Sequence, residues 1–154
     1  MINLREIINK VITKNNIYWS FVISIIFFLD RYTKILILNN FTESTYYLND
    51  YINLDLVWNI GIGFGFFSTE SNIIYNLITL IIVSVIIFLL YIFVKSETMD
   101  KLIYAFIIGG ALGNVYDRLI YKAVPDFIDM HYNNFHWFTF NVADIFISIG
   151  IAIF

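Results

Sequence analysis

The stretch from Gly109 to Asp144 decides the fold, and it contains the segments GGALGNVYDRL (109–119), VPDFID (124–129) and FNVAD (140–144). In sequence otherwise apolar enough to lie in a bilayer, these segments place five charged side chains: Asp117, Arg118, Asp126, Asp129 and Asp144. Ionisable groups at membrane depth are costly, so they normally face a polar interior and mark a functional site. What these carboxylates do is the central question that the sequence poses.

Composition and charge narrow the class of protein. The chain has 154 residues, enough for a single domain over 1–154, and it is 60% hydrophobic but only 14% charged. A soluble domain is closer to half apolar and a quarter charged, so a mean hydropathy of +0.77 predicts an integral membrane protein. The net charge of −3 and the lack of a basic patch argue against a nucleic-acid partner. Because there is no cysteine, disulfides, thiol nucleophiles and cysteine metal sites are excluded.

Four apolar segments predict transmembrane helices, over about 17–38, 71–94, 102–121 and 138–154. The first follows a basic N-terminus but precedes no small-residue cleavage site, so we interpret it as a retained helix that is not removed as a signal. Within it, Asp30 and Lys34 have the four-residue spacing of a helical ion pair. Lys and Arg concentrate in the N-terminus and in the 95–101 loop, which predicts cytoplasmic termini and outward-facing connections at 39–70 and 122–137.

Residues 52–66 alternate between apolar even positions and odd positions that are polar and then glycine. This period of two predicts strand structure, so we place a small antiparallel sheet at about 46–66, outside the membrane. The bare glycine face from Gly61 to Gly65 would suit a clamp over a bound peptide, and a bulged connector is the plainer interpretation. The predicted fold class is an all-α membrane protein of four transmembrane helices with a small extracytoplasmic antiparallel β-sheet.

Polar side chains from three predicted helices fall at one depth. At a rise of ~1.5 Å per residue, Asp30 lies roughly 12 Å, Asp117 roughly 6 Å and Asp144 roughly 9 Å below the outer surface. Asn114 and Asn141 fall at similar levels. This alignment predicts a polar, water-accessible pocket just under the outer face.

The residue types available restrict the chemistry of such a pocket. Neither His131 nor His136 falls in a predicted helix, so no Ser–His pair is available, and we interpret both as surface loop residues. A metal held by these histidines with Asp126 and Asp129 has no specific spacing, and we expect none. Paired carboxylates remain. Two aspartates that share a proton can activate water while protonating a carbonyl oxygen, and this chemistry needs no cofactor.

Three aspartates compete for the two catalytic roles: Asp117, Asp126 and Asp144. Asp117 precedes Arg118 and shares a helical face with Asn114, which favours a supporting role in a polar network. The sequence around Asp126 and Asp144 does not assign either carboxylate to such a network. The residues favour that pair by a narrow margin, and a dyad of Asp117 with Asp144 stays open.

At these residues the sequence resembles the lipoprotein signal peptidases (signal peptidase II), the bacterial membrane aspartic peptidases. Five segments carry the resemblance in the family's order: Asp30–Lys34 (D-x-x-x-K), Asn59–Gly61 (N-x-G), Gly110–Arg118 (GALGNxxDR), Val124–Asp129 (V-x-D-F-x-D) and Phe140–Asp144 (FNxAD). They cover nearly the whole chain from 30 to 144, and all five in order form a highly specific pattern. The sequence departs from the family's usual residues at Ile62, Gly63, Pro125 and Phe138, which leaves fine substrate preference open.

The resemblance implies an aspartic endopeptidase of the bacterial cytoplasmic (inner) membrane. It would remove the signal peptide from diacylglyceryl-modified prolipoproteins by cleaving before the lipidated cysteine. By motif, Asp126 and Asp144 are catalytic. The implied substrate-binding and support residues are Asp30, Lys34, Asn59, Gly61, Asn114, Asp117, Arg118, Asn141 and Ala143. Implied partners are prolipoproteins, membrane lipid and globomycin-type inhibitors, and we expect a monomer.

Two other classes of protein remain as alternatives. Intramembrane acids also act as proton relays, so a small transporter would show ion flux, although four helices without an internal repeat are few for one. A non-enzymatic assembly factor would use the Gly109-xxx-Gly113 spacing for helix pairing. Such a factor would keep its function in Asp126→Asn, and a peptidase would not.

Overall fold

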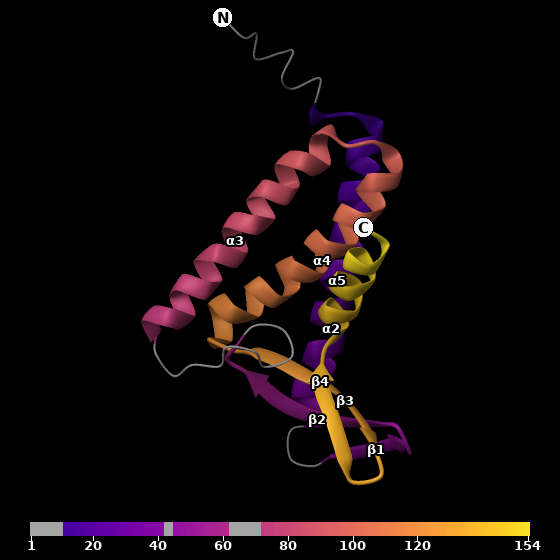
Figure 1. Cartoon of the computed structure of the whole chain (residues 1–154), viewed down its shortest axis with the longest axis vertical. Coiled ribbons are helices and arrows are strands. Elements are labelled where there is room, and N and C mark those ends of the chain that lie inside the picture. The colour runs from indigo at the N-terminus through magenta and orange to yellow at the C-terminus, as the bar shows by residue number, and fades with distance from the viewer. Residues whose placement is uncertain (1–10, 42–44, 62–71) are drawn as a thin grey trace, which may run out of the picture.

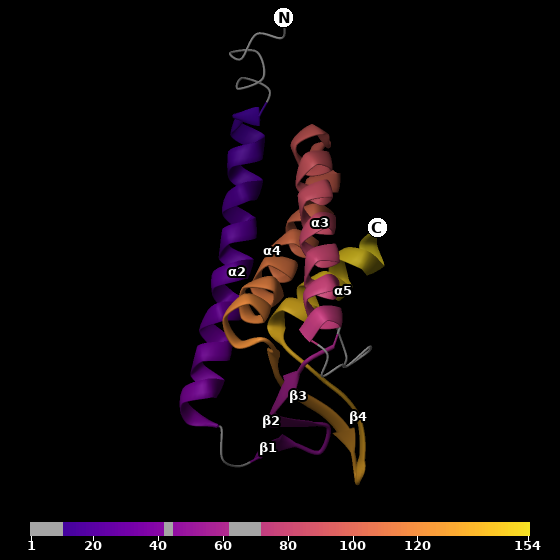
Figure 2. The same ribbon diagram turned by 90° about the vertical axis from the view of Figure 1, so that its left-hand side faces the viewer.

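The computed structural model describes residues 11–41, 45–61 and 72–154, and the described chain contains four helices and four strands (Figure 1). In chain order these are α2 (Lys14–Asn40), β1 (Tyr46–Asn49), β2 (Ile52–Asn59), α3 (Asn72–Lys95), α4 (Thr98–Tyr121), β3 (Val124–Tyr132), β4 (Phe135–Phe140) and α5 (Val142–Ile153). The sheet lies at the end of the helices opposite to the start of α2 (Figures 1 and 2).

Helix α4 is the centre of the helical layer, since it packs against α2, α3 and α5 (Figure 2). Ala105 and Ile108 are completely buried there. Two adjacent glycines permit the close approach: a Cβ at Gly109 would lie 2.8 Å from the Cβ of Ile26 in α2, and one at Gly110 would lie 2.5 Å from a backbone oxygen in α5. The GGALG segment therefore joins α4 to two helices at once, as small residues do between membrane helices.

The outer surfaces of the helices are apolar. Phe21 of α2 and Leu80 and Phe88 of α3 are all more than half exposed, as expected where lipid replaces water as the solvent. Among the described helices, one is long and apolar enough to cross a membrane by composition alone, at Ile73–Lys95, and Val142–Ile153 is a shorter apolar helix. Helices α2 and α4 fall outside that criterion, and both carry buried charged residues.

The four strands form one antiparallel sheet in the order β1-β2-β3-β4. Strand β3 follows α4 directly, after Lys122 ends the helix in a left-handed conformation (φ 59°). Its register against β2 pairs Val57 with Asp126 and Asn59 with Val124. The first residues of β3 are thereby fixed between the end of α4 and the end of β2.

The sheet corrects two predictions. Residues 122–137, expected to be a polar connection, form most of the β3–β4 hairpin, which turns at Asn133 with a φ of 52°. Phe138–Phe140, expected to begin the fourth helix, belong to β4 and pair with β3, because aromatic side chains favour a pleated surface. Within the predicted β segment at 46–66, strands cover 46–49 and 52–59. The glycines at 63 and 65, on which the clamp hypothesis depends, lie outside the described residues.

Candidate active site

A cavity of about 290 Å³ lies where α4, α5 and the sheet meet. Polar groups that line it come from β2, α4, β3 and α5, and apolar groups come from α3, α4, β3 and α5. The lining residues are Asn59, Ile82, Ala111, Asn114, Arg118, Val124, Asp126, Asn141, Asp144, Ile147, Ser148 and Ile151. Two carboxylates, those of Asp126 and Asp144, thus open onto one space.

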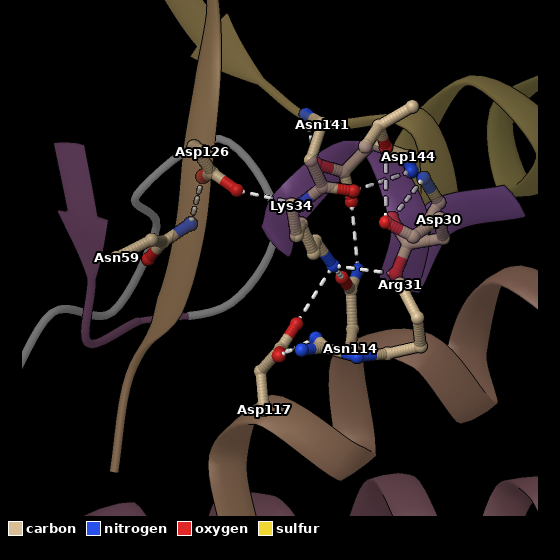
Figure 3. Close-up of polar contacts among 11 residues, drawn as sticks. Asp30, Arg31, Lys34, Asn59, Asn114, Asp117, Asp126, Asn141 and Asp144 are labelled. Atoms are coloured by element: carbon tan, nitrogen blue, oxygen red, sulfur yellow. Dashed lines mark hydrogen bonds and ion pairs between the residues drawn. The ribbon is translucent and has the colours of Figure 1, made fainter. Parts of the chain in front are cut away.

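Asp126 lies on β3 and is only 2% exposed. Its Oδ2 accepts a hydrogen bond from Asn59 Nδ2 at 2.9 Å, and its Oδ1 accepts one from Asn141 Nδ2 at 2.6 Å (Figure 3). Burial, and then the neighbouring Asp144 carboxylate, raise the pKa of Asp126 from its ordinary 3.8 to about 7, against the effect of these two donors. Asp126 is therefore poised to carry a proton near neutral pH.

Asp144 lies in the first turn of α5, where it forms a capping box with Asn141. The Asn141 side chain accepts from Asp144 N at 3.1 Å, and Asp144 Oδ2 accepts from Asn141 N at 3.2 Å. The other oxygen of Asp144 accepts from Asn114 Nδ2 at 2.9 Å. Asn141 therefore contacts both carboxylates. Its side-chain nitrogen donates to Asp126, and its backbone N–H donates to Asp144, while its side-chain oxygen caps the helix that carries Asp144.

Lys34 is fully buried and joins the helices behind the cavity. Its Nζ lies 2.8 Å from each of three oxygens, on Asp30, Asn114 and Asp117 (Figure 3). This confirms the predicted Asp30–Lys34 pair. The second oxygen of Asp30 accepts from Ala143 N at 3.0 Å, so the network also reaches α5. The contacts with Asp30 and Asn114 are hydrogen bonds and the contact with Asp117 is an ion pair, so this buried cation is paired, as burial requires.

Glycine is needed at position 113 for this arrangement. A Cβ there would lie 2.3 Å from Asp30 Oδ2, a separation that real Cβ contacts do not show. Asp30 cannot move away freely, because Lys34 and Ala143 hold its two oxygens. Because Gly113 has no side chain, the carboxylate of Asp30 can pack directly against α4.

Asp117 is fully buried in a polar network, as predicted, but its cationic partners lie on α2 and not beside it in the sequence. Its two oxygens contact Arg31 and Lys34. The adjacent Arg118 instead donates to the carbonyl of Gly61 and lies 5.3 Å from the ring centroid of Tyr75. Asp117 does not line the cavity. Sequence reasoning missed Arg31, although a second cation three residues before Lys34 in an apolar segment was the available signal.

Gly61 and Ala143 complete the set of predicted residues, and all eleven lie in or directly behind the cavity. Gly61 N donates to Asn59 Oδ1 at 2.8 Å, which orients the Asn59 amide toward Asp126. Ala143 is fully buried, and its backbone N–H anchors Asp30.

The histidines form a separate cluster on the hairpin. His136 Nδ1 lies 2.8 Å from Asp129 Oδ2, and its ring stacks on that of His131 at 5.4 Å between centroids. The prediction that both are loop residues is wrong, because each lies in a strand of the β3–β4 pair. The predicted surface position is confirmed for His136, which is exposed, and wrong for His131, which is buried. Within residues 11–41, 45–61 and 72–154, no group of three or more acidic or histidine side chains is arranged to hold a metal.

Comparison with known proteins identifies the family. Residues 22–154 match the family described as signal peptidase (SPase) II. The lipoprotein signal peptidase of Pelagibacter ubique (strain HTCC1062) is 46% identical over 146 residues, which cover 93% of this chain and 88% of that protein. The lipoprotein signal peptidase of Thermodesulfovibrio yellowstonii is 42% identical over 133 residues, covering 86% and 88% of the two chains.

The fold has solved counterparts. A bacterial membrane enzyme determined by the in meso method at 2.3 Å resolution superposes with a TM-score of 0.72 at 26% identity, over 88% of this chain and 83% of the other. A second bacterial membrane enzyme, determined at 1.9 Å, gives 0.73 at 23% identity over 88% of each chain and shares the fold. The sequence match over most of the chain and the likeness of the fold agree, and the chain belongs to the signal peptidase II family.

Proposed function

We propose that this chain is an intramembrane aspartic endopeptidase, which removes the signal peptide of diacylglyceryl-modified prolipoproteins by cleaving before the lipidated cysteine. Membership of the signal peptidase II family supports a peptidase that acts on lipoprotein precursors. The observation that carries the aspartic chemistry is the pair Asp126 and Asp144, which face one cavity and are both hydrogen-bonded to Asn141.

In the proposed reaction, Asp126 and Asp144 share one proton. The ionised carboxylate takes a proton from water, and the water oxygen bonds to the scissile carbonyl carbon while the protonated carboxyl donates its proton to the carbonyl oxygen. In the collapse of the gem-diol intermediate, the ionised carboxylate takes the proton of one hydroxyl, the C–N bond breaks, and the other carboxyl protonates the leaving amine, so the dyad again holds one proton. The raised pKa of Asp126 supports the acid role at neutral pH.

Asp117 fits a supporting role better than a catalytic one. It is fully buried, it does not line the cavity, and both of its oxygens contact cations of α2. These contacts favour the dyad of Asp126 with Asp144 over the alternative of Asp117 with Asp144.

We further propose that the four described helices lie in the bacterial cytoplasmic membrane, with the N-terminus in the cytoplasm and the sheet at the outer face. Helices α2, α3 and α4 cross the membrane, and the 12 residues of α5 run inward from the sheet. The apolar outer surfaces of the helices and the distribution of Lys and Arg support this topology. The dyad would then meet the scissile bond just under the outer surface, where a signal peptide and acyl chains partition. Globomycin-type inhibitors would bind the same cavity, and the enzyme would act as a monomer.

The decisive experiment is cleavage of a diacylglyceryl-modified prolipoprotein by purified wild type, Asp117→Asn, Asp126→Asn and Asp144→Asn, each checked for folding. We expect no cleavage by Asp126→Asn or Asp144→Asn and residual cleavage by Asp117→Asn. Cleavage retained in Asp126→Asn and lost in Asp117→Asn would move the dyad to Asp117 and Asp144. If folded wild type cleaves no prolipoprotein, the proposed peptidase function is refuted. The transporter alternative would then be tested by measuring ion flux.

A further inference from the structure

Arg31 is a buried cation that none of the family-like segments requires, since D-x-x-x-K leaves its position open. It is 7% exposed on α2, its guanidinium contacts Asp117 on α4, and its Cζ lies 4.5 Å from the ring centroid of Tyr116. Burying a guanidinium is expensive unless it is fully paired. The contact with Asp117 and the aromatic face offset that cost and fix the side chain in one place.

Among the charged groups in direct contact with Lys34 and Asp117, the charges balance only when Arg31 is included. Lys34 contacts two carboxylates, those of Asp30 and Asp117, and one ammonium cannot neutralise both. Arg31 supplies the second positive charge through Asp117 Oδ1. Without it, the cluster of Asp30, Asp117 and Lys34 would keep a net negative charge beside a dyad that must itself hold one negative charge, because the nearby buried cation Arg118 donates to the carbonyl of Gly61 and not to these carboxylates. Like charges disfavour ionisation.

A continuous chain of contacts links this balance to the dyad (Figure 3). Asp117 joins Arg31 to Lys34. Lys34 donates to Asn114 Oδ1 at 2.8 Å, so the amide of Asn114 presents its Nδ2 to Asp144 at 2.9 Å. Arg31 itself does not line the cavity, so it reaches the reacting atoms through this chain.

We infer that Arg31 is a positioning residue of the aspartate dyad. By neutralising the Asp117 carboxylate, it frees the Lys34 ammonium to orient the Asn114 amide toward Asp144. It thereby sets the pH range in which the dyad holds one proton. This inference rests on the proposed peptidase function. The plainer role, an ion pair that only fastens α2 to α4, makes a different prediction. It would change the stability of the protein and leave the pH dependence of the reaction alone.

Titratable and charged groups face this network from five elements, and all of them enter the expected pH behaviour. In the part of the chain that the structure describes, they are Asp30, Arg31 and Lys34 of α2, Tyr75 of α3, Tyr116, Asp117 and Arg118 of α4, Asp126 of β3 and Asp144 of α5.

The test is the pH dependence of kcat and KM for cleavage of a diacylglyceryl-modified prolipoprotein by wild type, Arg31→Gln, Asp117→Asn and the double variant. Removing the cation disfavours the ionised dyad, so both limbs of the profile for Arg31→Gln should move up by about 0.5 to 1 pH unit. Removing the anion should move both limbs of Asp117→Asn down. The double variant restores the balance and should return to the wild-type midpoint, with kcat affected more than KM.

Two further variants separate positioning from stability. Arg31→Lys keeps the charge and should keep the wild-type pH midpoint. If Arg31→Gln does not fold, the downward shift of Asp117→Asn carries the test. Lys101→Met is the matched control, because Lys101 is also a buried cation (2% exposed) but donates to backbone carbonyls of Phe93 and Ser96 near the start of α4. It should reduce stability without moving the profile.

The outcomes are distinct. Opposite shifts in the two single variants and their cancellation in the double variant support the inference. Unshifted limbs in folded, active Arg31→Gln, or a midpoint for Arg31→Lys displaced by half a unit or more, would overturn it. A wild type without cleavage would instead refute the proposed function, since no profile could then be recorded.

Discussion

Replacing Asp126 by asparagine should remove a large part of the pH dependence of folding stability. The pKa of Asp126 is raised from 3.8 to about 7 in the folded protein, so the folded state binds this proton more tightly than the unfolded state does. The resulting stabilisation is complete below about pH 4 and is lost as the pH rises through about 7. A shift of about three units, at 1.36 kcal/mol each, is worth about 4 kcal/mol.

The assay is thermal unfolding in detergent between pH 4 and pH 9. For a chain of this size, about 4 kcal/mol corresponds to a fall in Tm of about 8 to 16 °C across the interval. Asp126→Asn should lack this component, so the difference in Tm between variant and wild type should grow steadily from pH 4 to pH 8. Asp50→Asn is the matched control, because Asp50 is an exposed carboxylate of the same sheet region.

The refuting result is clear. If Asp126→Asn loses as much stability as wild type over this pH range, the proton on Asp126 does not stabilise the fold. Burial and the Asp144 charge would then not raise the pKa of Asp126 in the folded protein. The same result would weaken the acid role of Asp126, because a carboxyl with an ordinary pKa is ionised at neutral pH.

Three other predictions follow from the site. Gly113→Ala should destabilise the protein by about 1 to 3 kcal/mol, since its Cβ would meet Asp30 Oδ2 at 2.3 Å; an unchanged Tm would contradict the tight contact. Asn141→Ala should cost about 0.5 to 2 kcal/mol through the lost helix cap and reduce kcat by about 10²-fold or more through lost donation to Asp126, and full turnover would exclude this role. The kcat/KM of wild type should decline above about pH 7 as Asp126 and Asp144 lose their shared proton, and a plateau to pH 9 would oppose the shared-proton mechanism.

The parts of this structure that sequence predicts well are those decided over short distances. The apolar runs identified the four helices, because a run of some twenty apolar residues has few other uses. Asp30 and Lys34 could be paired because a helix places positions four apart on one face. The five family-like segments contain all eleven predicted site residues.

What sequence did not predict depends on long-range pairing. Arg31 and Asp117 are 86 positions apart, and nothing local distinguishes this partner from the adjacent Arg118. The polar and aromatic residues of the β3–β4 hairpin lack a clean alternation, so the sequence predicts a connection there and not two strands. Asn133-Asn134, between the paired residues Tyr132 and Phe135, was the local signal for a two-residue turn.

The two-residue turn at Asn133-Asn134 is a suitable site for inserting residues into the β3–β4 hairpin. Adding two residues on each side of Asn133-Asn134 would lengthen β3 and β4 together and leave every side chain on its present face. A single extra residue in one strand would reverse the faces of the strand beyond it. Since β4 leads directly into the cap of α5, such a slip would carry Asn141 away from Asp126. A reporter peptide or fluorophore carried at the tip could therefore follow the outer sheet in a working enzyme, provided that the pairing beneath it stays in phase.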